Sequence, residues 1–279
     1  MKLRTLQALY GLKWNPFVEE APLDNFMRDR ELEIFVRRLE LLCEQGGFAL
    51  VSGDAGCGKS VSLRLLVHDL QKIPDLQVRL LSRPQCFVGD FYRELGDLFG
   101  VRLEPHNRWA GTKVLRERWQ THIQSALTRP LLVVDEAQET STAVLTELRL
   151  LASCELDSKL LLTVVLAGDG RLNDRLRSAE LLPLGTRIRA RLLLSACTPD
   201  QLAALLDHTL QACGAPQLMT AELRHALATH AVGNRRVLMN LANEVLALGV
   251  ERNLQQLDEQ LFLEIAGPSA RTQTQGKRR

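Results

Sequence analysis

The residues best suited to chemistry in this sequence lie in one glycine-rich segment, Gly53-Asp-Ala-Gly-Cys-Gly58-Lys59-Ser60. The segment matches the pattern G-x-x-x-x-G-K-[ST]. Its glycines let successive backbone N–H groups turn toward phosphate oxygens, and the helix expected after the loop adds its positive end. Lys59 can reach the β- and γ-phosphates, and the Ser60 hydroxyl can ligate Mg²⁺. The segment therefore predicts a site for a nucleoside triphosphate with Mg²⁺.

Two adjacent carboxylates end a short apolar run, Leu131-Leu-Val-Val-Asp135-Glu136. In a nucleoside triphosphatase, Asp135 would hold the Mg²⁺ shell and Glu136 would polarise the attacking water. Taken alone, the run could be a strand that leaves the core, but the glycine-rich loop earlier in the chain favours the catalytic interpretation. Asp169 follows a later apolar run and is predicted to help position the water, with a plain turn residue as the alternative.

Positive charge that could stabilise the developing γ-phosphate occurs in two places. Before the last expected strand, arginines stand at alternating positions, Arg187, Arg189 and Arg191, and one of them could reach the ATP of a neighbouring subunit. The alternative is a solvated basic edge. Arg235 and Arg236 open an expected helix closer to the C-terminus, where an arginine could fold over the phosphates or could simply be surface charge.

The elements that would position these residues alternate short apolar runs with longer amphipathic runs. The runs expected to be strands are residues 48–52, 78–82, 131–135, 160–167 and 191–194, and the helices between them include 60–70, 88–99 and 143–151. Mostly continuous apolar runs suit strands that are covered on both faces. The alternation therefore predicts an α/β fold, in which a parallel sheet with right-handed crossovers is flanked by helices.

Beyond about residue 195 the apolar spacing is helical. Four helices are expected, the first with Pro199 near its start and the last reaching Ile265. We therefore divide the chain into an N-terminal segment over 1–47, an α/β domain over 48–194, a helical domain over 195–266 and a basic tail over 267–279. The tail has no apolar periodicity and is expected to be disordered when free.

The composition excludes several classes of protein. Of the 279 residues, 46% are hydrophobic and 24% are charged, which is ordinary for a folded soluble chain. The net charge is only +2, so any binding of nucleic acid must come from a local patch. Six cysteines without a Cys-x-x-Cys pair argue against a disulfide framework or a structural zinc. No apolar stretch approaches the roughly 18 residues of a membrane helix and no signal peptide is evident, so we expect a cytoplasmic protein without a membrane partner.

The order of these motifs resembles that of the AAA+ ATPases: the glycine-rich loop, the Asp135-Glu136 pair, Asp169, the Arg187 segment and the Arg236 helix. Within that family, Tyr10–Phe17 and Arg30–Glu33 resemble the branch that contains the ExeA-type secretion ATPases and the TniB/TnsC-type transposition ATPases. The resemblance covers about residues 8 to 266. It implies a P-loop sheet with a small helical lid, ATP and Mg²⁺ as cofactors, and a homo-oligomer.

The resemblance also implies a set of site residues. By similarity, the N-terminal segment would pack near the nucleotide and line the adenine pocket, and Arg187 would be a finger that acts in trans. Nucleotide contacts would come from Gly53, Ala55, Gly56, Cys57, Gly58, Lys59, Ser60, Val61 and Arg236. Two residues depart from the family pattern, because Cys57 stands where Thr or Ser is usual and Asp169 where many relatives carry Asn, Thr or Gln. These departures bear on the rate of hydrolysis more than on binding, and we expect hydrolysis to be slow.

The choice between the two branches depends on what accompanies the ATPase module. Secretion members of the family carry a membrane span and a peptidoglycan-binding region after it, and this sequence shows neither, which favours the transposition branch. That branch implies an ATP-dependent oligomer, a ring or a helical filament, that binds double-stranded DNA and delivers it to a transposase during DNA recombination. The alternative is a nucleotide-switched adaptor for protein remodelling or secretion that does not bind DNA. A metabolic P-loop kinase is disfavoured, because no motif for a small-substrate pocket follows the loop.

Basic surface would discriminate between these functions. The densest positive stretch of the α/β domain lies between the second and third strands and is interleaved with Tyr92, Trp109 and Trp119. This composition suits phosphate contacts with aromatic neighbours. The alternative is a set of solvated helix faces, with the tryptophans anchoring the core. The DNA contacts we predict from this stretch are Arg83, Arg93, Lys113 and Arg116.

Overall fold

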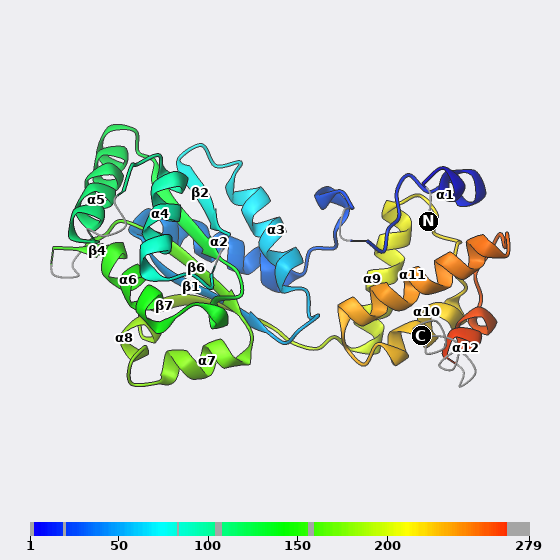
Figure 1. The fold of residues 1–279 in the computed structure, drawn as a ribbon. Helices are drawn as coiled ribbons and strands as arrows, with labels where there is room; N and C mark the ends of the chain where they lie inside the picture. The colour runs from blue at the N-terminus through cyan, green and yellow to red at the C-terminus, as the bar shows by residue number, and fades with distance from the viewer. Residues whose placement is uncertain (1–2, 19–20, 83, 104–107, 156–158, 267–279) are drawn as a thin grey trace, which may run out of the picture. The chain divides into compact units, whose positions relative to one another are not determined.

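The computed structural model describes residues 3–18, 21–82, 84–103, 108–155 and 159–266 (Figure 1). These residues form two units. The first, the sheet unit, contains Asp29–Asp54 and Lys59–Leu194; the second, the helical unit, contains the described parts of Met1–Arg28, Ala55–Gly58 and Ser195–Arg279. The basic tail predicted over 267–279 lies outside the described residues.

The sheet unit contains five parallel strands in the order β2-β3-β6-β1-β7. The strands are β1 (Gly47–Gly53), β2 (Leu76–Leu81), β3 (Arg129–Val134), β6 (Thr163–Gly168) and β7 (Ile188–Leu194). Every residue of β1 and β6 is buried, as continuous apolar runs predict for strands covered on both faces. The predicted parallel sheet flanked by helices is confirmed.

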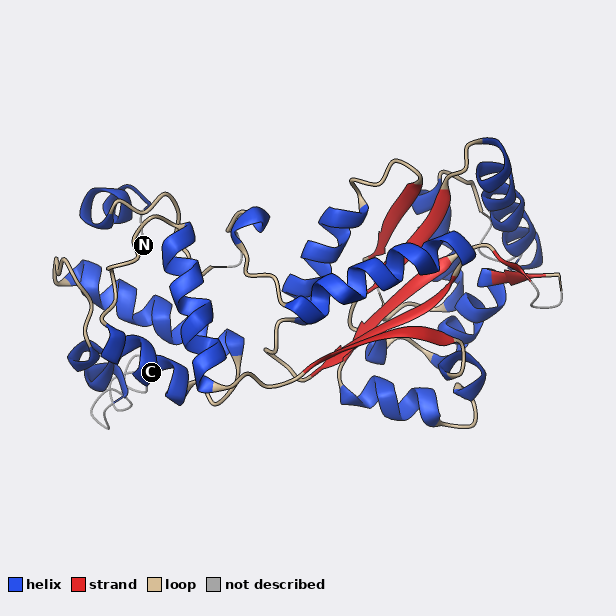
Figure 2. Ribbon diagram, turned by 180° about the vertical axis from the view of Figure 1, so that it is seen from behind, coloured by secondary structure: helices blue, strands red, loops and turns tan. Residues whose placement is uncertain are grey.

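Helices cover both faces of this sheet. Helix α2 contacts β1, β3 and β7 and lies across the face turned to the viewer in Figure 2. Helices α4 and α6 contact each other and lie in front of the sheet in Figure 1. The helices of this unit are α2 (Arg30–Gln45), α3 (Lys59–Leu70), α4 (Val88–Phe99), α5 (Arg108–Ser125), α6 (Thr142–Ala152), α7 (Gly170–Arg177) and α8 (Leu182–Gly185).

Two strand predictions differ from the structure. The run over 160–167 is divided, because Lys159–Leu160 (β5) pairs antiparallel with Ser153–Cys154 (β4), and β6 begins only at Thr163. The last strand begins at Ile188 and not at residue 191. It lies at the edge of the sheet with alternate residues exposed, so a search for continuous apolar residues finds only its end.

The helical unit contains four helices after residue 195 and one near the N-terminus. They are α1 (Leu3–Tyr10), α9 (Pro199–Ala212), α10 (Ala221–His230), α11 (Arg235–Glu251) and α12 (Glu259–Ala266). Side-chain caps fix the first turn of each of the four C-terminal helices: Thr198 for α9, Thr220 for α10, Asn234 for α11 and Asp258 for α12. Such caps satisfy backbone N–H groups that have no partner inside a helix.

The described residues of the range 1–47 are divided between the two units, after Arg28. Leu6, Leu12 and Phe17 are buried in the apolar core of the helical unit, and the Asn15 amide donates to Asn243 Oδ1 on α11 at 2.8 Å. Helix α2, in contrast, packs on the sheet. Apolar side chains in both halves of the range explain the division, because each half buries them in a different core.

Candidate nucleotide site

The candidate site lies at the carboxyl ends of neighbouring strands in the sheet. Strands β3, β6 and β1 are adjacent and parallel, and they end at Val134, Gly168 and Gly53. The residues that follow these strands therefore meet at one edge of the sheet. This is the usual position of ligands in open α/β sheets. The glycine-rich loop follows β1, the two carboxylates follow β3, and Asp169 follows β6.

Lys59 is the first residue of α3, and its side chain is only 7% exposed. Its Nζ donates to the carbonyl oxygens of Gly53 at 2.8 Å and Asp54 at 3.0 Å. These hydrogen bonds hold the ammonium group against the start of the loop, where the motif requires a cation. The next residue, Ser60, is exposed. Its hydroxyl, with the carboxylate of Asp135, provides the oxygen donors that Mg²⁺ accepts beside substrate phosphates.

Asp135 and Glu136 have different surroundings although they are adjacent. Asp135 is half-buried, and its Oδ1 accepts a hydrogen bond from the Glu136 backbone N–H at 2.8 Å. Burial raises the pKa of Asp135, and the charge of Glu136 adds to this effect. The hydrogen bond from the Glu136 N–H and the charge of Lys59 lower this pKa, but the net shift is upward. Glu136 is exposed, and its backbone has a φ of +49°, in the left-handed region that non-glycine residues rarely adopt. Such strain is concentrated at functional sites.

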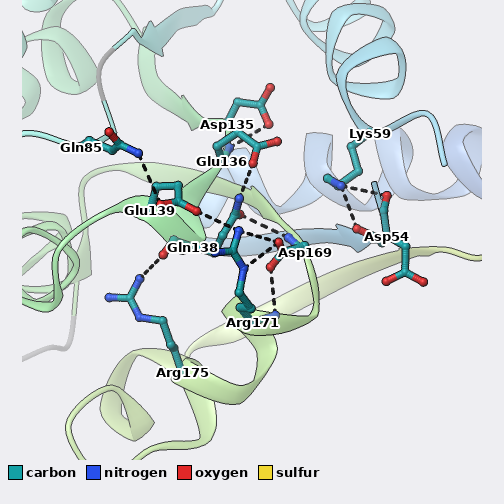
Figure 3. Close-up of polar contacts among 11 residues, drawn as sticks. Asp54, Lys59, Gln85, Asp135, Glu136, Gln138, Glu139, Asp169, Arg171 and Arg175 are labelled. Atoms are coloured by element: carbon teal, nitrogen blue, oxygen red, sulfur yellow. Dashed lines mark hydrogen bonds and ion pairs between the residues drawn. The ribbon is translucent and has the colours of Figure 1, made fainter. Parts of the chain in front are cut away.

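Gln138 is a site residue that the sequence analysis missed. Its side chain is 7% exposed, its Nε2 donates to the Glu136 carboxylate, and its Oε1 accepts from the Asp169 backbone N–H at 3.3 Å (Figure 3). A Cβ at Gly168 would lie 2.6 Å from Gln138 Oε1, so only glycine leaves room for this amide. The sequence indicated Gln138 only by its position, two residues after the Asp135-Glu136 pair. Gln138 thus connects the candidate base to the end of β6.

Asp169 caps α7, which is the turn role that the sequence left open beside water positioning. Its carboxylate accepts from the Arg171 N–H at 2.9 Å and pairs with the Arg171 guanidinium at 2.8 Å (Figure 3). The hydrogen bond from the Arg171 side chain holds the pKa of Asp169 below its usual range. The Arg171 side chain also contacts Glu139 at 2.8 Å. A role of Asp169 at the attacking water stays a prediction.

The tip of the loop, Ala55–Gly58, belongs to the helical unit. The Asn234 side chain donates to the Ala55 carbonyl at 2.9 Å, and the Arg236 N–H donates to the Gly56 carbonyl at 3.1 Å. Cys57 is buried and 4% exposed, whereas the Arg236 side chain is exposed. The backbone of the loop is thus fixed at its carbonyl oxygens.

The comparisons with known proteins agree with this geometry. Residues 42–176 match the family model of the AAA domain. They contain the glycine-rich loop, both carboxylates and Asp169. The chain has the AAA+ P-loop fold, since solved structures over most of its length share that architecture.

A curated relative is similar over a large part of the chain. General secretion pathway protein A of Aeromonas hydrophila is 32% identical over 213 residues, which are 75% of this chain and 38% of the relative. The chain therefore spans well under half of the length of that protein. Among the residues that the structure describes, no helix is both long enough and apolar enough to cross a bilayer.

Similar solved structures include ORC and Cdc6 proteins. Drosophila ORC bound to DNA gives a TM-score of 0.69 at 17% identity and covers 98% of this chain and 70% of that one. Aeropyrum pernix ORC2 in ADPNP–ADP complexes gives 0.69 at 14% identity, with 91% and 71% covered. Cdc6p of Pyrobaculum aerophilum gives 0.66 at 16% identity, with 87% and 67% covered. At these identities the likeness establishes the fold alone.

Arg187 lies near the amino ends of the strands, whereas the glycine-rich loop starts at the carboxyl end of β1. It precedes Ile188, which pairs with Phe48 at the start of β1, whereas the loop follows Gly53 at the end of β1. At about 3.3 Å per residue, the two ends of this seven-residue strand are about 20 Å apart. The Arg187 guanidinium donates to the Pro183 carbonyl at 2.6 Å. Arg187 is therefore far from the Gly53 end of β1 in its own chain.

The predicted DNA residues that the structure describes have partners within the AAA-type unit. Arg93 pairs with Asp90 at 2.7 Å and Lys113 with Glu117 at 3.8 Å, and Arg116 donates to the Leu150 carbonyl. Arg93 and Lys113 are nevertheless exposed, and pairs of this kind are weak. The fourth candidate, Arg83, lies outside the described residues. DNA contact stays a prediction.

Two of the aromatic residues interleaved with these cations are not at the surface. Tyr92 is 1% exposed and donates to Glu147, and Trp119 is fully buried against the edge of Phe99, with ring centroids 5.2 Å apart. They complete the apolar core beneath α4 and α5, which is the alternative that the sequence left open for Trp119. The prediction of exposed aromatic neighbours for DNA is therefore wrong for these two residues.

Proposed function

We propose that this chain is an ATPase that binds Mg-ATP and hydrolyses it slowly to ADP and phosphate. The observation that carries the proposal is the meeting of Lys59, Asp135 and Glu136 at one edge of the sheet of an AAA domain. Lys59 would contact the terminal phosphates, and Glu136 would accept a proton from the attacking water. Ser60 and Asp135 would hold Mg²⁺, which neutralises charge on the phosphates.

Two substitutions test the assignment of these roles. Lys59→Ala should abolish ATP binding, because it removes the cation of the loop. Glu136→Gln should still bind ATP but hydrolyse it at least about a hundredfold more slowly, because it keeps the shape of the base and loses its basicity. The matched control is Glu180→Gln, which removes an exposed carboxylate elsewhere in the same unit. Unchanged turnover in Glu136→Gln would refute the role of Glu136.

We further propose that this ATPase is an oligomer that binds double-stranded DNA and delivers it to a transposase. Support comes from the basic stretch that includes Arg93 and Lys113, from the motifs shared with the transposition branch, and from the likeness to an ORC structure described as bound to DNA. Near-neutral net charge argues that a monomer binds DNA weakly. An oligomer formed with ATP would multiply the phosphate contacts, so binding should be cooperative and insensitive to sequence.

A second function is favoured by one specific observation, the 32% identity to General secretion pathway protein A. It is a nucleotide-switched adaptor for protein remodelling or secretion that does not bind DNA. Anisotropy of a labelled duplex separates the two functions. A DNA-delivering ATPase should bind strongly with a non-hydrolysable ATP analogue and weakly with ADP. Absence of nucleotide-dependent binding at low salt would reject the DNA function in favour of the adaptor.

A further inference from the structure

Asn234 uses both ends of its side-chain amide. Its Oδ1 accepts hydrogen bonds from the backbone N–H groups of Arg236 at 3.0 Å and Val237 at 3.1 Å, which caps α11. Its Nδ2 donates to the Ala55 carbonyl in the glycine-rich loop at 2.9 Å. Asp and Ser cap helices as well as Asn does. Neither can cap α11 and also place a donor where Nδ2 lies, since Asp lacks a donor and Ser is one bond shorter.

A second hydrogen bond joins the same two segments. The Arg236 N–H donates to the Gly56 carbonyl at 3.1 Å, so two consecutive carbonyls of the loop are held by the first turn of α11. Gly56 has a φ of +82°, and a Cβ there would overlap the Asn234 amide. A glycine at position 56, a variable position of the motif, is thus required by Asn234 as well as by the curvature of the loop.

These two bonds determine which way the loop N–H groups point. In a trans peptide, the C=O of one residue and the N–H of the next point in opposite directions. The described residues contain no cis peptide bond. Because the Ala55 and Gly56 carbonyls point to α11, the N–H groups of Gly56 and Cys57 point away from it. Successive N–H groups on one side of a loop form the concave site that binds phosphate oxygens.

We propose that Asn234 is a positioning residue for the phosphate loop: it holds the loop backbone so that its N–H groups are arranged for phosphate before the nucleotide arrives. The inference rests on the proposed nucleotide function and concerns a residue that contacts no phosphate itself. It predicts that the donor of Asn234, and not its capping role, contributes to the affinity for both ATP and ADP. Binding to a prearranged site avoids the cost of ordering the loop.

The test separates the donor from the cap. Asn234→Ser and Asn234→Asp keep the cap of α11 and lose the donor to Ala55. Loss of one such hydrogen bond should weaken binding of both Mg-ATP and Mg-ADP about tenfold, and more in Asn234→Asp, because a carboxylate would face a carbonyl. The control for added charge is Asn240→Asp, at an exposed position of the same helix, whose affinity should stay within about twofold of wild type.

Two further measurements make the outcome decisive. Without nucleotide, backbone amides in residues 54–60 should exchange with deuterium faster in Asn234→Ser than in wild type, while the thermal midpoint stays unchanged. Wild-type affinity and exchange in both Asn234 variants would overturn the inference while Lys59-dependent binding upholds the proposed function. Failure of the wild-type protein to bind either nucleotide would instead overturn the proposed function, and the inference with it.

Discussion

Gln138 holds the candidate base Glu136 through a side chain that is itself fixed at its other end. Gln138→Leu keeps the volume of the side chain and removes both hydrogen bonds, to the Glu136 carboxylate and from the Asp169 N–H. We expect kcat to fall about tenfold with little change in KM, because the base loses its orientation and the nucleotide loses no contact. The half-buried Asp169 N–H would also lose its partner, which should cost about 1 kcal/mol of unfolding free energy.

The control for this variant is Gln85→Leu. Gln85 is exposed and donates to Glu139 at 3.3 Å on the outer side of the same network. Its removal should leave both kcat and stability unchanged within error. Steady-state kinetics and urea unfolding measure the two effects separately. Equal kinetics for Gln138→Leu and wild type would show that the bond to Glu136 does not orient the base.

The Cys43 thiol gives a prediction that depends on pH. Burial in α2 raises its pKa to about 12. An acid whose pKa is higher in the folded than in the unfolded state stabilises the fold below its unfolded value, about 8.5, and this stability is lost as pH rises toward 12. Unfolding free energy should therefore fall between about pH 9 and 12, and less so in Cys43→Ala. Identical alkaline slopes in denaturant titrations of the two proteins would refute this.

Single residues were predictable where a motif has fixed spacing and unpredictable where a contact is made across strands. Local sequence patterns, the glycine-rich loop and the acidic pair after an apolar run, predict Lys59, Asp135 and Glu136 as site residues. The amide of Gln138 contacts the residue after β6, and the amide of Asn234 contacts the loop. No local sequence pattern contains these long-range contacts. A single sequence does not show which distant residues the fold brings into contact.

At the scale of elements, the direction of the strands decides how Arg187 can act. Because β7 is parallel to β1, an arginine just before β7 lies near the start of β1, whereas the loop follows the end of β1. We therefore expect Arg187 to contact the nucleotide of a neighbouring subunit. Arg187→Ala should then lower kcat by at least about a thousandfold. Mixing it with inactive Lys59→Ala protein should restore activity at mixed interfaces, where an intact Arg187 meets an intact Lys59.

The control mixture combines Arg189→Ala with Lys59→Ala. Arg189 is exposed on β7 and contacts Gln45 at 3.2 Å, so its loss should not inactivate the protein alone. Turnover per mole of protein, measured across mixing ratios, distinguishes the two pairs. A mixture of Arg187→Ala and Lys59→Ala that stays inactive at every ratio would favour a site completed within one subunit.

Strands and helices with many buried residues were predictable from the sequence, whereas those with few buried residues were missed or found only in part. The central strands, covered on both faces, are continuous apolar runs, and α4 was found at its observed bounds, Val88–Phe99. Helix α5 was missed, because its charged residues surround a narrow buried stripe that includes Leu115 and Trp119. The edge strand β7 was found only in part for the same reason, since only alternate residues are buried.

At the scale of the whole molecule, charge is unevenly distributed along the chain. Residues 269–279 contain Arg271, Lys277, Arg278 and Arg279, which is +4, so deleting them changes the net charge from +2 to −2. If these residues contact phosphates, the deletion should weaken DNA binding and make the slope of log affinity against log salt shallower by up to about four. Anisotropy between about 50 and 200 mM salt measures the slope. An unchanged slope would exclude the tail from DNA contact.

The chain divides into two units at positions that sequence indicates only in part. The change from strands to helices near residue 195 is visible in the periodicity, and the sheet unit ends at Leu194. The association of the N-terminal residues with the helical unit is not visible, because Leu6, Leu12 and Phe17 pack with residues from Leu202 onward. The association of the loop tip is not visible either, because it depends on contacts with Asn234 and Arg236. The adenine pocket implied for the N-terminal segment stays a prediction.

The outer position of β7 has a consequence for solubility. A strand with one free side presents unpaired backbone donors and acceptors to any other extended chain, and charged side chains on such a strand discourage that pairing. Arg189 and Arg191 are exposed there, and so is Leu193, at 62%. We therefore expect the charges of Arg189 and Arg191 to oppose aggregation through the exposed Leu193 on the same strand. Replacing both with valine should produce a protein that folds and then precipitates at concentrations the wild type tolerates.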